Sequence, residues 1–100
     1  MKKYLNWIAK FYPSYDKCKD RCYEAVSSMI TAFPELLVQT GRANGIFHCW
    51  CKTTDGEIVD PTDKQFTKPI RYDFIADRFL DKDEIETSTG IVFLKEHKND

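Results

Sequence analysis

Apolar residues recur at two different spacings along the chain, and the change of spacing predicts helices first and strands afterwards. Near the N-terminus they fall every three or four residues, which favours amphipathic helices over residues 3–11 and 17–33. Each stretch stops at a proline, Pro13 or Pro34, which lacks the N–H that a helix interior needs. Both helices are expected to bury one apolar face.

From residue 36 onwards, short runs rich in β-branched and aromatic residues predict strands. The expected order is a strand at 36–40, a loop at 41–45, and then a hairpin made of residues 46–53 and 57–60. Pro61 ends the hairpin because proline cannot donate to a strand ladder. These strands are expected to form a small antiparallel sheet.

The pattern after residue 66 predicts fewer features. Residues 70–74 alternate like a strand, although apolar residues of the stretch 74–80 would equally fit a helical face, so a strand and then a short helical turn are expected. An acidic connector at 81–86 leads to an apolar strand at 90–94, and His97 is expected to be solvated in a charged tail. The predicted fold class is α+β, with helices on one side of a small antiparallel sheet.

The register of the hairpin decides which of its side chains meet. If residues 54–56 form a three-residue loop, with Gly56 as the left-handed residue, then Trp50 faces Asp60 across the pair. His48 lies diagonal to Asp60 on the same face, within reach of a hydrogen bond. A two-residue turn would send Asp60 to the opposite face and separate the two side chains.

Composition limits the class of protein. One hundred residues, 42% of them hydrophobic and 31% charged, make residues 1–100 a single domain with one core. The formal net charge of −1 supplies no field that would attract nucleic acid or an acidic membrane surface. The N-terminus resembles neither a secretion signal nor a membrane span, so a cytoplasmic protein with reduced cysteines is expected, in a host cytoplasm if a phage encodes it.

A cysteine in the first turn of a helix is a candidate nucleophile. The positive end of the helix dipole stabilises a thiolate there and lowers its pKa. Cys22 occupies this position if the second helix begins at residue 20 or 21, whereas Cys18 does if the helix begins at Asp16. The sequence leaves both starts open.

Cys22, His48 and Asp60 supply the three roles that thiol catalysis needs. An imidazole takes the proton of the thiol, and a carboxylate on the other ring nitrogen fixes the orientation of the imidazole. Trp50, on the same face, would shield the bond between His48 and Asp60 from water. The predicted catalytic residues are therefore Cys22, His48 and Asp60, and this chemistry requires no cofactor and no metal.

Four short motifs stand in a fixed order: C-Y-E-A at residues 22–25, F-P-E-L at 33–36, H-C-W at 48–50 and D-G-E-I-V-D-P-T-D-K-Q-F at 55–66. In this order they resemble the papain-like and transglutaminase-like cysteine enzymes. The resemblance is nearest to small bacterial and phage proteins of which the leader peptidases of lasso-peptide biosynthesis look like distant relatives. It covers residues 20–66.

The resemblance implies a papain-like core and a cysteine-dependent hydrolase or acyltransferase. Its substrate would be a peptide, isopeptide or other amide, attacked through a thioester, and a protein partner would help a chain this small to define that substrate. The same three residues are implied as catalytic. Papain-like enzymes have a glutamine before the nucleophile, whereas Asn6 is the only amide upstream of Cys22 here. The oxyanion hole would then rest on the Cys22 N–H and a second donor.

Two alternatives belong to other functional classes. The first is a zinc module with all four cysteines around one ion: Cys18, Cys22, Cys49 and Cys51. The second is an inactive protein of the same fold that acts by binding a partner. The separate residues also have structural interpretations, with Cys22 as a buried apolar group, His48 as a satisfied core histidine and Asp60 as a turn cap. In the catalytic interpretation Cys49 and Cys51 face away from His48 and pack.

Overall fold

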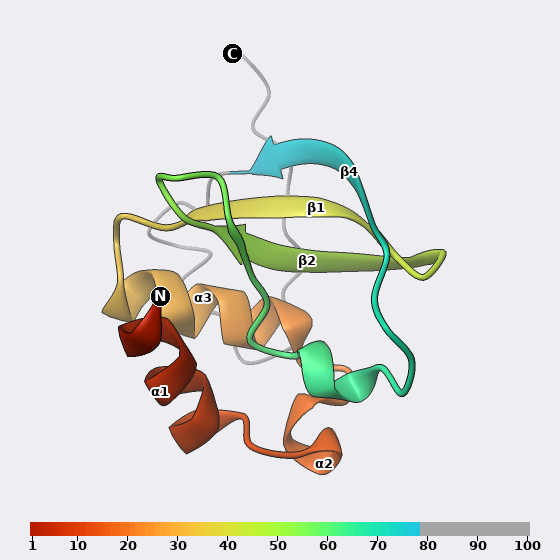
Figure 1. The fold of residues 1–100 in the computed structure, drawn as a ribbon, viewed down its shortest axis with the longest axis horizontal. Coiled ribbons are helices and arrows are strands. Elements are labelled where there is room, and N and C mark those ends of the chain that lie inside the picture. Colours follow the sequence, from red (N-terminus) through yellow and green to blue (C-terminus); the bar gives the residue numbers. More distant parts are fainter. Residues whose placement is uncertain (79–100) are drawn as a thin grey trace.

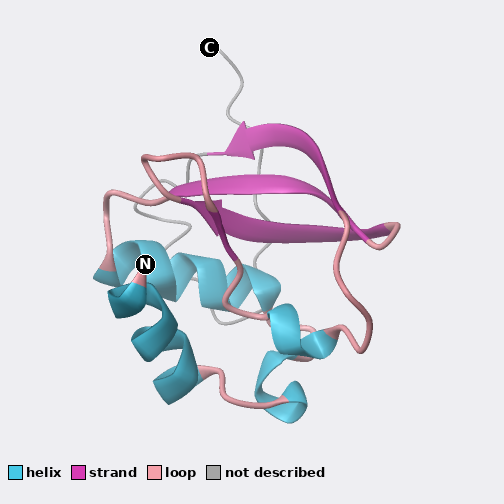
Figure 2. Cartoon of the chain, viewed as in Figure 1, coloured by secondary structure: helices cyan, strands magenta, loops and turns pink. Residues whose placement is uncertain are grey.

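A computed structural model describes residues 1–78, and in this part helices come first and a sheet follows. The elements are α1 (Lys2–Phe11), α2 (Tyr15–Cys18), α3 (Cys22–Ala32), β1 (Leu37–Ala43), β2 (Ile46–Lys52), β3 (Ile58–Val59), the 3-10 helix η1 (Asp63–Gln65) and β4 (Tyr72–Arg78). The strands form one antiparallel sheet in the order β3-β2-β1-β4. Figure 1 shows β2, β1 and β4 side by side. The helices gather on one side of the sheet (Figure 2).

The α+β class with an antiparallel sheet is confirmed. The connector expected at 81–86, the strand at 90–94 and His97 lie outside the described residues.

The first helix forms where the sequence predicts it. Tyr4 and Ile8, one turn apart, are buried on its inner face, while Lys2 and Lys10 are exposed. Burial of this apolar face stabilises a helix that is too short to be stable alone. The helix ends at Phe11, two residues before Pro13.

The single helix expected over residues 17–33 is wrong, because the chain breaks between α2 and α3. Asp20 adopts a left-handed conformation with φ of 59°, which interrupts the helical hydrogen bonds. Arg21 is then the N-cap of α3, and Cys22 is its first residue. The break settles the choice between the two helix starts in favour of the one that places Cys22 in the first turn.

The loop expected at 41–45 is also wrong, because β1 continues through Gly41 to Ala43. The chain reverses at Asn44 and Gly45, whose φ angles of 51° and 81° are the pair of positive values found in a type I′ hairpin turn. Gly41 serves packing instead, since a Cβ on it would lie 2.0 Å from the Asp73 carbonyl oxygen. A glycine that suggests a loop is here a point of close approach between strands.

The three-residue hairpin loop is confirmed, and with it the predicted register. Cys51 pairs with Val59, which is the alignment that places Trp50 opposite Asp60. Gly56 has a φ of 86°, the left-handed value that the loop requires. The backbone N–H of Thr53 donates to the Glu57 carbonyl and closes the loop at 2.9 Å. The paired segments are shorter than predicted, with β2 ending at Lys52 and β3 limited to two residues.

The helical turn expected after residue 74 is wrong as far as residue 78, since β4 runs as a strand to Arg78. It pairs with β1 through an irregular register. Thr40 is opposite Ala76, but the next residue, Gly41, is opposite Phe74, so Ile75 is an extra residue on β4. This is a β-bulge, which bends a strand and changes the direction of its side chains.

Alternation along β2 divides its side chains between two environments. Cys49 and Cys51 belong to the apolar core that α3 covers, together with Val38 of β1 and Val59 of β3. His48 and Trp50 are also buried, but they interact with polar groups. The sheet is therefore buried on both sides at this point, with apolar packing on one side and a hydrogen-bonded network on the other.

Candidate active site

Cys22 begins α3 and is partly buried against the core. The Cys49 thiol, His48 and the Cys49 backbone N–H are the donors close enough to its sulfur to lower its pKa. Because neighbouring side chains of a strand point to opposite faces, a sulfur that reaches both His48 and Cys49 lies beside the backbone of β2. The N-terminus of α3 thus brings the nucleophile candidate to the edge of the strand that carries the histidine.

These donors make Cys22 an acidic thiol. The hydrogen bond from the Cys49 thiol has the largest effect, and the bond and positive charge of His48 add to it. Together they outweigh burial, which alone would raise the pKa, and lower the pKa of Cys22 to about 5. The helix N-terminus favours negative charge in the same way. At neutral pH the sulfur is a thiolate, the form of cysteine that reacts as a nucleophile.

His48 links Cys22 to Asp60. Its Nε2 donates to Asp60 Oδ2 at 2.8 Å, which leaves Nδ1 for the sulfur of Cys22. Burial would by itself lower the pKa of His48, but the hydrogen bonds to Asp60 and Cys22 prevail and raise the pKa to about 9. Between these two pKa values the site holds a thiolate and an imidazolium. This is the ion pair that activates a cysteine nucleophile.

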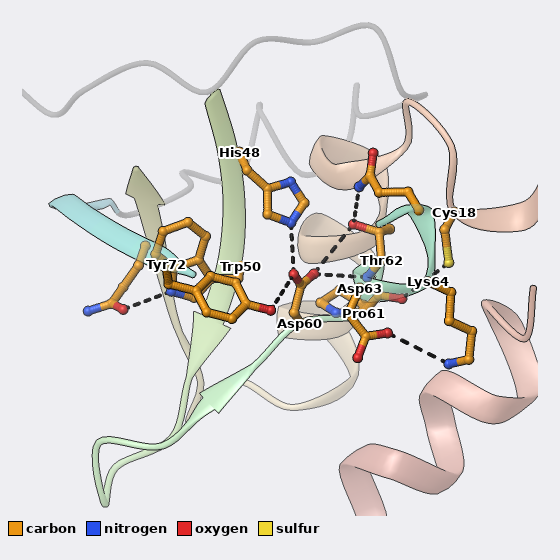
Figure 3. Close-up of polar contacts among 11 residues, drawn as sticks. Cys18, His48, Trp50, Asp60, Pro61, Thr62, Asp63, Lys64 and Tyr72 are labelled. Atoms are coloured by element: carbon orange, nitrogen blue, oxygen red, sulfur yellow. Dashed lines mark hydrogen bonds and ion pairs between the residues drawn. The ribbon is translucent and has the colours of Figure 1, made fainter. Parts of the chain in front are cut away.

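Asp60 is a buried carboxylate whose two oxygens both accept hydrogen bonds. Oδ2 accepts from His48 and, at 2.9 Å, from the Tyr72 hydroxyl, while Oδ1 accepts from the Thr62 backbone N–H at 3.0 Å. The dashed lines from these three residues converge on Asp60 in Figure 3. The Gln65 amide in turn donates to the Thr62 hydroxyl. A buried charge supported in this way keeps a fixed position.

Two aromatic rings enclose the imidazole. The Phe66 ring meets His48 edge-on with centroids 5.1 Å apart, and the Trp50 ring lies 5.9 Å away at an angle of 33°. Trp50 is fully buried and donates its Nε1–H to Gln39 Oε1 at 3.0 Å. The shielding role predicted for Trp50 agrees with this position. Phe66 was missed as a wall of the site, although it closes the last of the four motifs.

The other three cysteines are buried thiols. Cys18 donates weakly to the Pro61 carbonyl, and burial raises its pKa. Burial likewise raises the pKa of Cys49 and of Cys51. The prediction that Cys49 and Cys51 pack rather than react agrees with these environments. The contact of Cys49 with Cys22 was not predicted, because alternation alone separates Cys49 from the face of His48.

The structure does not bring the four cysteines around one point, as the zinc alternative requires. Among residues 1–78, which include all four, no three His, Cys, Asp or Glu side chains are grouped so as to hold a metal ion. In the same part of the chain no helix is both long and apolar enough to cross a membrane. Asn6, the only upstream amide, is exposed on α1.

Comparison of the chain with protein-family models, with curated proteins and with solved structures gives no match. A function must therefore be argued from the residues of the site. Three of them stand in one line: His48 is hydrogen-bonded to Asp60 on one side and lies close enough to Cys22 on the other to lower the pKa of the thiol. Such a line can hold a nucleophile, move a proton and keep the proton carrier in one orientation.

Proposed function

We propose that this protein is a cysteine-dependent hydrolase or acyltransferase that cleaves a peptide, isopeptide or other amide bond through a thioester. The observation that carries the proposal is the line from Cys22 through His48 to Asp60, in which His48 is hydrogen-bonded to Asp60 at 2.8 Å and interacts with Cys22 strongly enough to shift the pKa values of both. His48 has a carboxylate on one ring nitrogen and an acidic thiol as the neighbour of the other, which is the arrangement that thiol catalysis requires. The motifs that resemble papain-like and transglutaminase-like enzymes support the same proposal, and we propose that the fold is a minimal form of their core.

The first half of the reaction forms the thioester. The Cys22 thiolate attacks the carbonyl carbon of the amide and gives a tetrahedral oxyanion. The Cys22 backbone N–H has no partner within α3, because it lies in the first turn, and we assign it to this oxyanion. The His48 imidazolium then gives its proton to the amide nitrogen, the carbon–nitrogen bond breaks, and the amine leaves.

The second half returns the enzyme to its starting state. His48, now neutral, accepts a proton from water or from an acceptor amine, which attacks the thioester carbon. The carbon–sulfur bond breaks, Cys22 leaves as a thiolate, and His48 is again an imidazolium. Asp60 holds the ring in place throughout. Hydrolysis and transfer differ only in the nucleophile of this step.

An activated ester tests the chemistry without knowledge of the natural substrate. Wild-type protein mixed with p-nitrophenyl acetate is expected to release a burst of one p-nitrophenolate per chain and to carry one acetyl group on Cys22, measured by absorbance and by intact mass. Cys22→Ala should give neither, while Cys51→Ala should behave like the wild type. Acetylation that is slow, without a burst and equal in Cys22→Ala would refute the proposal.

The natural substrate can then be sought through the intermediate. The protein is incubated in a cell lysate, and rapid acid quenching traps the acyl groups on Cys22. Peptide mass then identifies these groups. A peptidyl group on Cys22, absent from His48→Ala, is expected for a protein that acts on peptide or isopeptide bonds. A partner protein that defines the substrate would be recognised in a different way. Purified protein alone would fail to form the adduct on Cys22, and addition of the partner would restore it.

A further inference from the structure

Asp60 receives support from a residue that the reaction itself does not use. The Tyr72 hydroxyl donates to Asp60 Oδ2 at 2.9 Å, the same oxygen that accepts from His48. Tyr72 is the first residue of β4, which lies at one edge of the sheet, whereas Asp60 follows β3 at the other edge. The bond therefore joins the two edges of the sheet at the candidate active site (Figure 3).

The bulge in β4 directs two side chains towards this network. Tyr72 and Asp77 are five residues apart, and in a regular strand residues an odd number apart point to opposite faces. Yet Tyr72 contacts Asp60, and Asp77 accepts a hydrogen bond at 2.9 Å from Gln39, the acceptor of Trp50. The extra residue of the bulge lies between Tyr72 and Asp77 and brings both side chains to the same face of the sheet. Bulges that direct a side chain in this way are common beside active sites.

The ring and the hydroxyl of Tyr72 have different contacts. The ring packs edge-on against Trp50 with centroids 4.9 Å apart, a contact that phenylalanine would keep. The hydroxyl is committed to Asp60, and burial together with this carboxylate raises the pKa of Tyr72. Asp60 and Tyr72 also border a cavity of about 370 Å³ that Asp63 and Lys64 help to line. Without the hydroxyl, water in this cavity would compete with His48 for the carboxylate.

We propose that Tyr72 is a positioning residue that fixes the Asp60 carboxylate against His48 and, through it, the imidazole against Cys22. The proposal rests on the proposed cysteine chemistry. The Tyr72 hydroxyl bonds to Asp60 and the ring packs against Trp50, so Tyr72 acts on the reacting groups through Asp60. It acts by holding Asp60 Oδ2, the acceptor of His48, in one place. Removal of the hydroxyl should therefore change the pKa and the orientation of His48.

The test compares Tyr72→Phe with Tyr4→Phe, which loses a similar hydroxyl hydrogen bond, to Glu35, on α1 and away from the site. In Tyr72→Phe the acylation of Cys22 by p-nitrophenyl acetate should slow about tenfold. The pKa of His48, followed by the NMR signals of its ring, should fall from about 9 towards about 8 because its bond to Asp60 weakens. Tyr4→Phe should match the wild type in both measurements.

The outcomes separate this inference from the proposed function. Unreactive Cys22 in the wild type refutes the proposed function, whereas a reactive wild type with Tyr72→Phe and Tyr4→Phe alike in rate and in His48 pKa refutes only the role of Tyr72. A rise of the His48 pKa in Tyr72→Phe also refutes it, since the hydroxyl would then compete with His48 for Asp60. Thermal denaturation monitored by circular dichroism shows whether each variant is folded, and the NMR titration needs no enzymatic activity.

Discussion

The two faces of the sheet differ in chemistry although one strand supplies both. On one face Cys49 and Cys51 lie in an apolar core against α3, where thiols are buried and their pKa values are raised. On the other, His48 and Trp50 join a polar network through hydrogen bonds to Asp60 and Gln39. A histidine and a cysteine adjacent in sequence thus occupy opposite kinds of environment.

The difference shows that burial alone does not determine the reactivity of a thiol. Cys22 is also partly enclosed, yet its pKa falls because donors and a positive charge face it. Cys51 lacks such donors in the described structure, and its pKa rises. The apolar face contributes stability, and the polar face orients the His48 ring. Cys22 lies at the edge of β2, where it contacts side chains from both faces.

Removal of the base from the polar face should have the largest effect. His48→Ala is expected to slow acylation of Cys22 about 10²–10⁴-fold, because Cys22 loses the base that takes its proton and the positive charge that stabilises its thiolate. The measurement is the burst rate with p-nitrophenyl acetate. The matched control is His97→Ala, the same change at the other histidine of the chain. Equal rates in the two variants would mean that His48 has no part in the chemistry.

Overfilling of the polar face should destabilise the whole sheet. A Cβ on Gly41 would lie 2.0 Å from the Asp73 carbonyl oxygen and 2.8 Å from the Trp50 ring, so Gly41→Ala should cost about 3 kcal/mol of unfolding free energy in urea denaturation. Gly45→Ala is the control. It has open space around it and should cost about 1 kcal/mol, from its positive φ of 81° alone. A smaller cost at Gly41 than at Gly45 would contradict the packing described here.

The contact between the two faces can be tested at Cys49. Its thiol makes the largest contribution to the acidity of Cys22, so Cys49→Ala should raise the pKa of Cys22 from about 5 to about 6. The pH dependence of iodoacetamide labelling measures it. Cys51→Ala removes the same atoms from the same face and should leave the pKa of Cys22 unchanged. A common shift in both variants would indicate a general disturbance of the core.

The smallest effect is expected from Cys51 itself. Cys51→Ala removes one buried sulfur from the apolar face and should cost about 1 kcal/mol of stability in urea denaturation. The acylation rate should stay at the wild-type value, since the Cys51 thiol faces the core. A loss of rate greater than the loss of stability explains would place Cys51 within the catalytic network.

The parts of the fold that were predictable depend on local signals. The hairpin register followed from Gly56, whose left-handed conformation fixes the loop, and this register brought His48 and Asp60 together. The break before α3 was not predictable, because Asp20 is an ordinary helical residue by pattern and only its φ marks the break. Gly41 was misinterpreted as a loop residue, since nothing local indicates that another strand passes within contact distance.

The parts of the site that were missed depend on long-range geometry. Tyr72 reaches Asp60 only because β4 pairs with β1 and contains a bulge, neither of which alternation reveals. Cys49 contacts Cys22 because the helix N-terminus lies beside the backbone of β2, where both faces of the strand are accessible. The candidate nucleophile, base and orienter could be predicted because the roles proposed for them require fixed residue types in a suitable order. Their supporting residues have no such signature.

The most direct test of the account is the rate of iodoacetamide labelling at each cysteine as a function of pH, read by peptide mass. Cys22 is expected to label selectively at about pH 6, with a rate that rises through about pH 5 as the thiolate forms and then stays level until His48 loses its proton near pH 9. Cys18, Cys49 and Cys51 should label only after unfolding. Slow labelling of all four cysteines, with a midpoint at Cys22 near the ordinary thiol value of about 8.5, would contradict the thiolate–imidazolium pair and with it the proposed enzyme.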